Sequence, residues 1–204
     1  YAKIGGGGCF EPYGKLTMGH FCHLGMYSII NLARPVSIGN EVGLGTSTYV
    51  YTHGAYASIL DGKPVSFAPI EIGDRTWIPG AIVNPGVKIG KDCVIAVGSV
   101  VTKDLPDGCL AGGVPCKIIR ENAYPKPTNH SEIDDFMKGF EIPNIDYSYF
   151  DCCIQLKDTA IDLMNKTIIG KVTVDSERIL HLLRRYGIRF YYENVDGIYQ
   201  RWNE

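Results

Sequence analysis

The sequence predicts a mainly β protein whose first part is a parallel β-helix of hexapeptide repeats, and two observations lead to this fold class. An aliphatic residue followed by a small one recurs along the chain, at Ile38-Gly39, Leu44-Gly45, Ile72-Gly73, Ile89-Gly90 and Ile95-Ala96. The intervals from Ile38 to Leu44 and from Ile89 to Ile95 are both six residues. Six residues are a whole number of strand alternations but not of helical turns. The repeat therefore predicts short strands on the successive faces of a coil.

Corner residues support the same fold. The aliphatic positions are followed by Gly39-Asn40, Gly73-Asp74 and Gly90-Lys91-Asp92, and we expect these to supply the positive φ angles of the corners. A β-sandwich is the alternative, but its strands recur at about eight to twelve residues without a fixed short repeat. Between Trp77 and Ile89 the repeat is one residue short, which predicts a bulge or a tightened corner near Pro79-Gly80.

Taken in chain order, the repeat defines a β-helix domain over residues 1–120. Residues 1–34 read as degenerate early coils, and because the chain opens at Tyr1 in glycine-rich repeat-like sequence, we expect native residues to precede it. The repeat is clear over residues 35–50 and is interrupted by a long polar loop over about 51–69. Long loops that leave a regular scaffold often carry function. The coil resumes at Ile70, ends near Leu110, and is followed by a turn at Gly112–Pro115.

The chain beyond Arg120 has no hexapeptide signal. Residues 121–130 are proline-rich and predict a linker, and residues 131–204 predict a C-terminal α+β extension of unassigned role. Its expected elements are strands at 160–163 and 167–173, a helix at 176–186, and strands at 188–192 and 198–202 that flank an Asp196-Gly197 hairpin turn. We expect Asp175 to cap the helix and Gly187 to follow its end. Packing, oligomerisation and acceptor binding are all open roles.

Composition excludes several function classes. The 204 residues include 20 basic and 22 acidic side chains, a formal net charge of -2, so no basic excess indicates nucleic acid. No apolar run approaches the ~18 residues that a membrane-spanning helix needs. The seven cysteines are an odd number without the spacing of a metal site, and no signal peptide precedes them. The cysteines are Cys9, Cys22, Cys93, Cys109, Cys116, Cys152 and Cys153. We expect a reducing, cytoplasmic location.

An ordered set of motifs over residues 35–120 carries a family resemblance. It comprises PVSIGN, the pair Thr52-His53, a loop, then PIEIGDRTWI, NPGVKIG, GSVVTKD and AGGVPCKIIR. The chain resembles the hexapeptide-repeat acyltransferases, in particular the group of galactoside, maltose and nodulation-factor O-acetyltransferases. The resemblance implies a left-handed β-helix, a homotrimer with active sites between subunits, and acetyl-CoA as donor to a sugar or saccharide hydroxyl.

The resemblance also assigns catalytic positions. An alcohol is a poor nucleophile until a base removes its proton, and histidine titrates in the right range for that task. His53 matches the family's catalytic histidine in context and spacing. The oxyanion formed on the thioester must meet preorganised donors, and the family's backbone N–H falls at Gly80, or at Ala81 because this coil is one residue short. In the loop, Asp61 is a candidate for orienting the acceptor.

Donor binding is assigned by resemblance to three further stretches. Val97, Gly98 and Ser99 match the positions that contact the pantetheine arm, and Thr102 and Lys103 match the next contacts. Lys117 and Arg120 match two basic residues near the nucleotide end, with lysine in place of one arginine. Lysine keeps the charge but loses the two-pronged geometry of arginine toward phosphate.

Three alternatives to sugar O-acetylation stay open. N-acetylation of an amino sugar or nucleotide-linked amino sugar needs the same base and donor. A non-catalytic β-helix scaffold would keep the repeats without the chemistry. A zinc enzyme similar to the γ-class carbonic anhydrases would need three histidines, for which His20, His23 and His53 are available; we expect no metal, since the His20–His23 cluster does not match that family. The acceptor is not identified, although capsule, O-antigen and other envelope sugars are frequent in the family.

Overall fold

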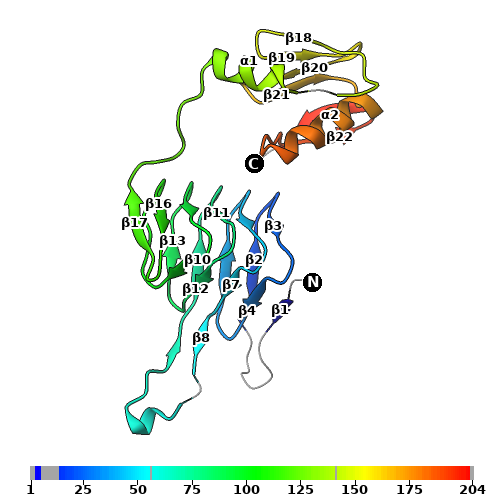
Figure 1. Ribbon diagram of the computed structural model, residues 1–204. Coiled ribbons are helices and arrows are strands. Elements are labelled where there is room, and N and C mark those ends of the chain that lie inside the picture. Colours follow the sequence, from blue (N-terminus) through cyan, green and yellow to red (C-terminus); the bar gives the residue numbers. More distant parts are fainter. Residues whose placement is uncertain (1–2, 6–13, 56, 141, 203–204) are drawn as a thin grey trace. The chain divides into compact units, whose positions relative to one another are not determined.

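The computed structural model describes residues 3–5, 14–55, 57–140 and 142–202, and its internal contacts divide the chain into two units (Figure 1). The first unit comprises residues 1–126 and the second residues 127–204. The boundary lies inside the segment predicted as a linker, but both ends of that segment make structure. Ala123 is buried and its N–H donates to the Gly108 carbonyl at 2.6 Å, whereas a helix already begins at His130.

The first unit is a parallel β-helix of three sheets, which confirms the predicted fold class (Figure 1). One sheet contains β1 (Lys3–Gly5), β4 (Ile29–Asn31), β7 (Tyr49–Val50), β12 (Ile82–Val83) and β15 (Val100–Val101). The second contains β2 (Leu16–Met18), β5 (Val36–Ile38), β10 (Ile70–Ile72) and β13 (Lys88–Ile89). The third contains β3 (His23–Leu24), β6 (Gly43–Leu44), β11 (Trp77–Ile78), β14 (Val94–Ile95), β16 (Leu110–Gly112) and the antiparallel β17 (Lys117–Arg120).

The repeated aliphatic residues fill the interior of this coil. Ile38, Leu44, Ile72, Ile89 and Ile95 are all buried and belong to one core cluster. Because successive side chains of a strand point to opposite faces, the residue beside each of them points outward. Stacked copies of the same inward position therefore give a continuous aliphatic core.

The corners differ in part from the expectation. Positive φ falls on Glu41, Arg75 and Asp92, at 57°, 55° and 57°, so the prediction holds at Asp92 but is wrong for the first two glycine pairs. The glycines are required for a different reason, which is the close approach of neighbouring coils. A Cβ on Gly73 would lie 2.5 Å from the backbone nitrogen of Lys91 in the next coil. Glycine is needed there for space rather than for backbone conformation.

The outer faces of the coil differ in polarity. The second sheet presents an exposed polar ladder of Thr17, Ser37, Glu71 and Lys88. Lys88 Nζ lies 3.0 Å from Glu71 Oε1. The first sheet instead presents Ile29, Tyr49, Ile82 and Val100 in register, all half-buried. One face of the coil is thus polar and another is apolar.

The interruption at residues 51–69 has its own structure. A short antiparallel hairpin of β8 (His53–Gly54) and β9 (Ser66–Phe67) leaves the coil and carries the 3₁₀ helix η1 (Ile59–Asp61) beyond it (Figure 1, cyan). The Ser58 side chain caps η1 and Gly62, at φ 71°, ends it.

The second unit packs two helices and an antiparallel sheet around a separate core. The sheet contains β18 (Ser148–Phe150), β19 (Cys153–Gln155), β20 (Thr159–Asp162) and β21 (Thr167–Gly170). The hairpin β22 (Tyr192–Val195) and β23 (Ile198–Arg201) turns at Asp196-Gly197 as predicted. The helices are α1 (His130–Lys138) and α2 (Val174–Arg185), and no helix within the described ranges is long and apolar enough to cross a membrane.

The start of α2 corrects the predicted cap. Asp175 lies inside the helix, and Thr173 is the N-cap. Thr173 Oγ1 accepts the Ser176 N–H at 3.0 Å, and Ser176 Oγ accepts the Thr173 N–H at 2.9 Å. These two reciprocal hydrogen bonds provide acceptors for two backbone N–H groups that have no acceptor within the helix. The elements α1, β18 and β19 were not predicted.

Candidate active site

His53 is positioned by the coil below it and by the hairpin that it begins. It follows β7, opens β8, and is half-buried. Its ring stacks on Phe67 of β9 with a centroid distance of 5.7 Å and an interplanar angle of 16°. Its Nδ1 lies 2.8 Å from Oδ1 of Asn31, the last residue of β4. Stacking and hydrogen bonding together fix the plane of the imidazole.

The hydrogen bonds around Asn31 determine which nitrogen of His53 carries the proton. The same Asn31 Oδ1 accepts the backbone N–H of Ala33 at 3.2 Å. A backbone nitrogen can only donate, so the atom that faces it must be the amide oxygen and not the amide nitrogen. An oxygen in that position accepts from His53, which requires a proton on Nδ1. Neutral His53 therefore carries its lone pair on Nε2.

Thr52 completes this network. Its Oγ1 accepts the Arg34 N–H at 3.0 Å and lies 2.7 Å from Asn31 Oδ1 and 3.1 Å from the Asn31 backbone oxygen. Thr52 and Asn31 are 0% and 6% exposed. A buried and fully bonded network holds its members in one arrangement. His53 thus rests on a rigid support rather than on a mobile loop.

Asn31 and Phe67 were missed by the sequence analysis. The sequence does contain a hint of the role of Asn31. This residue ends the strand Ile29–Asn31, whose other two residues are aliphatic, and by register it lies opposite Tyr51 of the next coil. A polar residue at that repeat position one coil before the histidine is a detectable deviation. Phe67 has no such signal, since its place beside His53 arises from the β8–β9 pairing.

Gly80 and Ala81, the candidates for the oxyanion donor, form a close corner of the coil. Gly80 has φ 146°, and a Cβ there would lie 2.9 Å from the Thr46 carbonyl oxygen. The Gly80 carbonyl accepts the Gly98 N–H at 2.7 Å. Both residues are buried, and within the described ranges neither N–H donates to another residue. Buried N–H groups without an acceptor are uncommon in folded proteins.

One chain does not bring His53 and Gly80 together. His53 follows β7, whereas Gly80 precedes β12. These strands are parallel neighbours, with Tyr49 opposite Ile82. A residue that follows one parallel strand lies at the carboxyl ends of the strands, whereas a residue that precedes the neighbouring strand lies at their amino ends. The two predicted catalytic groups of a single chain are therefore at opposite edges of the first sheet.

The residues predicted to contact the donor occupy the last coils. Val97 is 74% exposed, and Gly98 stacks above Gly80 through the hydrogen bond described above. Ser99 is buried, and its hydroxyl donates to the Ala96 carbonyl and accepts the Gly113 N–H. The Ser99 side chain thus links the corner at Ala96 to the corner at Gly113. Ser99 itself is not accessible from the surface.

The basic residues predicted at the nucleotide end are exposed. Thr102 and Lys103 follow β15, and Lys117 and Arg120 are the two ends of β17. Among the residues that the structure describes, no ion pair includes Lys103, Lys117 or Arg120. The end of the coil consequently carries cations whose charge is not neutralised by the described part of the chain.

Asp61 lies on η1 and is exposed. Its carboxylate takes part in none of the ion pairs of the described ranges. The neighbouring Ile59 and Leu60 are 67% and 93% exposed. The loop therefore presents apolar side chains beside the predicted acceptor-orienting acid.

The buried thiols of the coil are unsuited to act as nucleophiles, and the described residues form no metal-binding cluster. Cys93, Cys109 and Cys116 are buried in the coil. Burial, followed by the contact with Cys93, raises the pKa of the Cys109 thiol to about 12, and burial also raises the pKa of Cys116. A buried thiol that stays protonated is a poor nucleophile. In the described ranges no group of three or more His, Cys, Asp or Glu residues is arranged to hold a metal ion.

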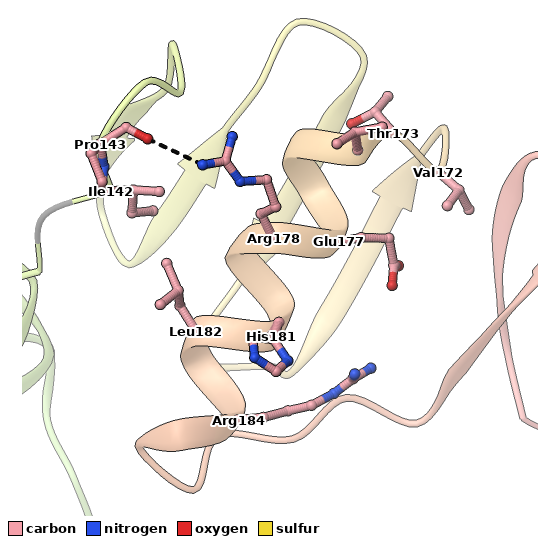
Figure 2. A pocket seen from close by; sticks show the side chains of 10 residues that line it. Ile142, Pro143, Val172, Thr173, Glu177, Arg178, His181, Leu182 and Arg184 are labelled. Atoms are coloured by element: carbon pink, nitrogen blue, oxygen red, sulfur yellow. Dashed lines mark hydrogen bonds between the residues drawn. The ribbon is translucent and has the colours of Figure 1, made fainter.

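The second unit has a cavity of about 780 Å³ beside α2 (Figure 2). Its lining includes the apolar Ile142, Val172 and Leu182 and the basic His181 and Arg184. Two of its polar side chains are engaged within the unit, since Glu177 Oε1 accepts from Tyr199 at 2.7 Å and Arg178 Nη2 donates to the Pro143 carbonyl at 3.5 Å. This cavity contains no arrangement of base, nucleophile and donor.

Comparison with known proteins agrees with the coil and its motifs. The family model described as bacterial transferase hexapeptide (six repeats) matches residues 69–103. Over residues 69–103 the chain thus carries the repeats of this family, and it is similar to hexapeptide-repeat acetyltransferases. This confirms the resemblance inferred from the motifs. The chain is 37% identical over 131 residues to galactoside O-acetyltransferase from Escherichia coli (strain K12), an alignment that covers 59% of this chain and 64% of that protein.

Solved structures of two acetyltransferases are also similar to this hexapeptide-repeat chain. The polySia specific acetyltransferase NeuO is 27% identical with a TM-score of 0.50, over 60% of this chain and 55% of that chain. The hexapeptide-repeat containing acetyltransferase VCA0836 from Vibrio cholerae is 33% identical with a TM-score of 0.48, over 52% of this chain and 62% of that chain. The present chain spans less than two thirds of the length of the curated relatives it matches.

The assigned tautomer of His53 is directly testable. In ¹⁵N-labelled protein at a pH where the ring is neutral, we expect the proton on Nδ1 and an unprotonated resonance for Nε2. Asn31→Ala removes the acceptor, so the ring should return to a mixture of both tautomers. His181, which is exposed on α2, serves as the internal reference for a ring without this support. A wild-type His53 with its proton on Nε2 would contradict the assignment.

Proposed function

We propose that this protein is an acetyl-CoA-dependent O-acetyltransferase that acts on a sugar or saccharide hydroxyl, with His53 as general base. The observation that carries the proposal is the Asn31–His53 hydrogen bond, because it directs the lone pair to Nε2. The function of a relative supports the same chemistry, since the Escherichia coli protein is a galactoside O-acetyltransferase. NeuO, whose fold is similar, is a polySia specific acetyltransferase.

In this mechanism the acetyl group passes directly from donor to acceptor. Nε2 of His53 removes the proton of the acceptor hydroxyl while the hydroxyl oxygen forms a bond to the thioester carbonyl carbon. The carbonyl oxygen becomes an oxyanion, for which the Gly80 or Ala81 N–H is the proposed donor. Collapse of this intermediate breaks the carbon–sulfur bond, and the imidazolium returns its proton to the leaving thiolate. The products are the acetyl ester and free coenzyme A, with no acetyl-enzyme.

Donor binding is proposed for the last coils. The exposed backbone at Val97 and Gly98, next to the buried Ser99, is proposed to contact the pantetheine arm, and Thr102 and Lys103 extend this surface. Lys117 and Arg120 are proposed to bind the phosphates, because both are exposed cations outside the ion pairs found in the described ranges. Hydrogen bonds between such cations and phosphate are stronger than neutral ones. Asp61 is proposed as a contact to the acceptor.

We further propose a homotrimer whose active sites lie between subunits. Two observations support an association. The candidate base and the candidate oxyanion donor lie at opposite edges of one sheet, so a second copy is needed to pair them. The first sheet also presents an apolar outer ladder that includes Ile29, Tyr49 and Ile82. Burial of such a ladder against another copy would be favourable at about 25 cal/mol per Å².

Activity measurements test the assignment of the base. We expect acetyl-CoA consumption, followed as free thiol release, on some member of a panel of sugars and amino sugars. His53→Ala should lower kcat/KM by roughly 10²–10⁴-fold, the usual contribution of a positioned base. The affinity for acetyl-CoA should stay unchanged in that variant. Turnover that survives intact in His53→Ala would refute the assigned base, and absence of acetyl-CoA binding in the wild type would favour the scaffold.

The phosphate contacts make a separate prediction. Removing the charge in Lys117→Ala or Arg120→Ala should raise the Kd for acetyl-CoA by about tenfold or more, since a hydrogen bond to a charged group contributes about 1.5–3 kcal/mol. The Kd is measured by isothermal titration calorimetry. Lys91→Ala is the matched control, because that lysine is a cation of the same coil that faces Asp107 at 4.0 Å. Equal effects at all three positions would contradict a localised phosphate site.

Association through the first sheet predicts a sharp contrast between two charged substitutions. Ile82→Glu places a carboxylate on the apolar ladder and should convert a particle of three chains into single chains in sedimentation velocity. Ser37→Glu places the same charge on the polar second sheet and should leave the particle intact. Unchanged far-ultraviolet circular dichroism would show that both variants fold. Wild-type protein that sediments as a single chain would contradict the trimer.

A further inference from the structure

Arg34 is placed beside the candidate base by the same contacts that hold His53. Its guanidinium carbon lies 5.1 Å from the centroid of the Phe67 ring, on which the His53 ring also stacks. Its backbone N–H donates to Thr52, the residue directly before His53. One aromatic ring and one threonine hydroxyl therefore position a cation and a base together. The distance from the guanidinium carbon to the centre of the His53 ring cannot exceed the sum of these two distances to the Phe67 centroid, which is about twice the length of one sugar unit.

The Arg34 side chain is held in place, and its guanidinium has further N–H donors available. It is exposed, and Nη1 donates to the Ala33 carbonyl at 2.8 Å. This bond and the contact with Phe67 hold the guanidinium in place. A guanidinium has five N–H donors, so a single bond to a carbonyl leaves the fork available for a second group.

The charge of Arg34 is not neutralised in the described part of the chain. None of the ion pairs found there includes Arg34. Arg75, an exposed arginine of the same unit, shows the contrast. Its Nε and Nη2 donate to both oxygens of Asp92, at 2.6 and 2.8 Å. Among the described residues, the coil thus pairs Arg75 with a carboxylate, whereas Arg34 has no carboxylate partner.

We propose that Arg34 is a specificity-determining residue that binds an oxyanion on the acceptor, so that the preferred acceptor is an acidic sugar. This inference rests on the proposed function, because it assumes that the acceptor hydroxyl meets Nε2 of His53. The guanidinium fork matches a carboxylate or a phosphate ester with two parallel hydrogen bonds. An anion held there would orient the sugar toward the base. The acidic group is thus a carboxylate, as in a uronic acid, or a phosphate ester.

The test compares acceptors that differ only at C6, where galactose has a hydroxymethyl group, galacturonate a carboxylate and galactose 6-phosphate a phosphate ester. Galactose, galacturonate and galactose 6-phosphate are offered to wild-type protein and to Arg34→Met, which keeps an unbranched side chain for Phe67 and removes the cation. We expect wild-type kcat/KM to be at least tenfold higher for one acidic sugar than for galactose, and to decline as salt is added. Arg34→Met should lose this preference through KM, with kcat/KM for galactose changed by less than about twofold. Galacturonate and galactose 6-phosphate distinguish the two possible anions.

Two further variants make the result specific to Arg34. Arg34→Lys keeps the charge without the fork and should recover only part of the preference. Arg75→Met removes an arginine that is already paired with Asp92 and should leave the preference unchanged. A wild type without preference for either acidic sugar would overturn the proposal. An equal loss on all three acceptors in Arg34→Met would also overturn it, since that pattern indicates a purely structural role.

Direct binding separates this inference from the proposed function. Titration of galacturonate and galactose 6-phosphate into wild-type protein and Arg34→Met is followed by NMR. Binding of either anion to the wild type that is weakened at least tenfold in Arg34→Met supports the anion site even if no sugar is acetylated. Equal binding by both proteins overturns it. A raised Kd for acetyl-CoA in Arg34→Met would also overturn it, by placing Arg34 in the donor site, whereas failure of acetyl-CoA to bind the wild type at all would refute the proposed function instead.

Discussion

The close stacking of one coil on the next is the constraint on which the rest of this structure depends. Backbone N–H groups of each coil donate to carbonyls of the neighbouring coil, as in Gly73 to Ile89 at 2.8 Å and Gly98 to Gly80 at 2.7 Å. This spacing leaves no room for a side chain at corners such as Gly73. It also aligns the inward aliphatic residues into one core. The functional positions that belong to the coil are therefore fixed relative to the coils directly below and above them.

The candidate active site is a consequence of that stacking. Asn31 and Thr52 lie in neighbouring coils, and their hydrogen bond is possible only because these coils are in register. The β8–β9 hairpin then adds Phe67, which contacts both His53 and Arg34. Three segments of the chain thus combine to orient one imidazole. A rigid scaffold with a short excursion is a common way to hold catalytic groups.

The second unit is stabilised by a different kind of packing. Its sheet is antiparallel, its helices cover one apolar face, and its core is separate from that of the coil. Buried polar groups in it are paired, as in the contact of Ser176 with Tyr199 at 2.8 Å. Its cavity is lined mainly by apolar groups and lacks the elements of a catalytic site. The chemistry proposed for this chain thus resides in the β-helix alone.

The sequence by itself determined the period of the coil, the interruption after His53 and the identity of the candidate base, because local repeats and motifs encode these features. It also indicated the hairpin at Asp196-Gly197, but it missed α1 and assigned the cap of α2 to Asp175 instead of Thr173. Caps depend on local geometry that composition does not specify. Only the tertiary structure decided the tautomer of His53, the placement of Arg34 and Phe67 beside it, and the separation of His53 from Gly80. Those relations join residues that are distant in sequence, so only the register of the coils can establish them.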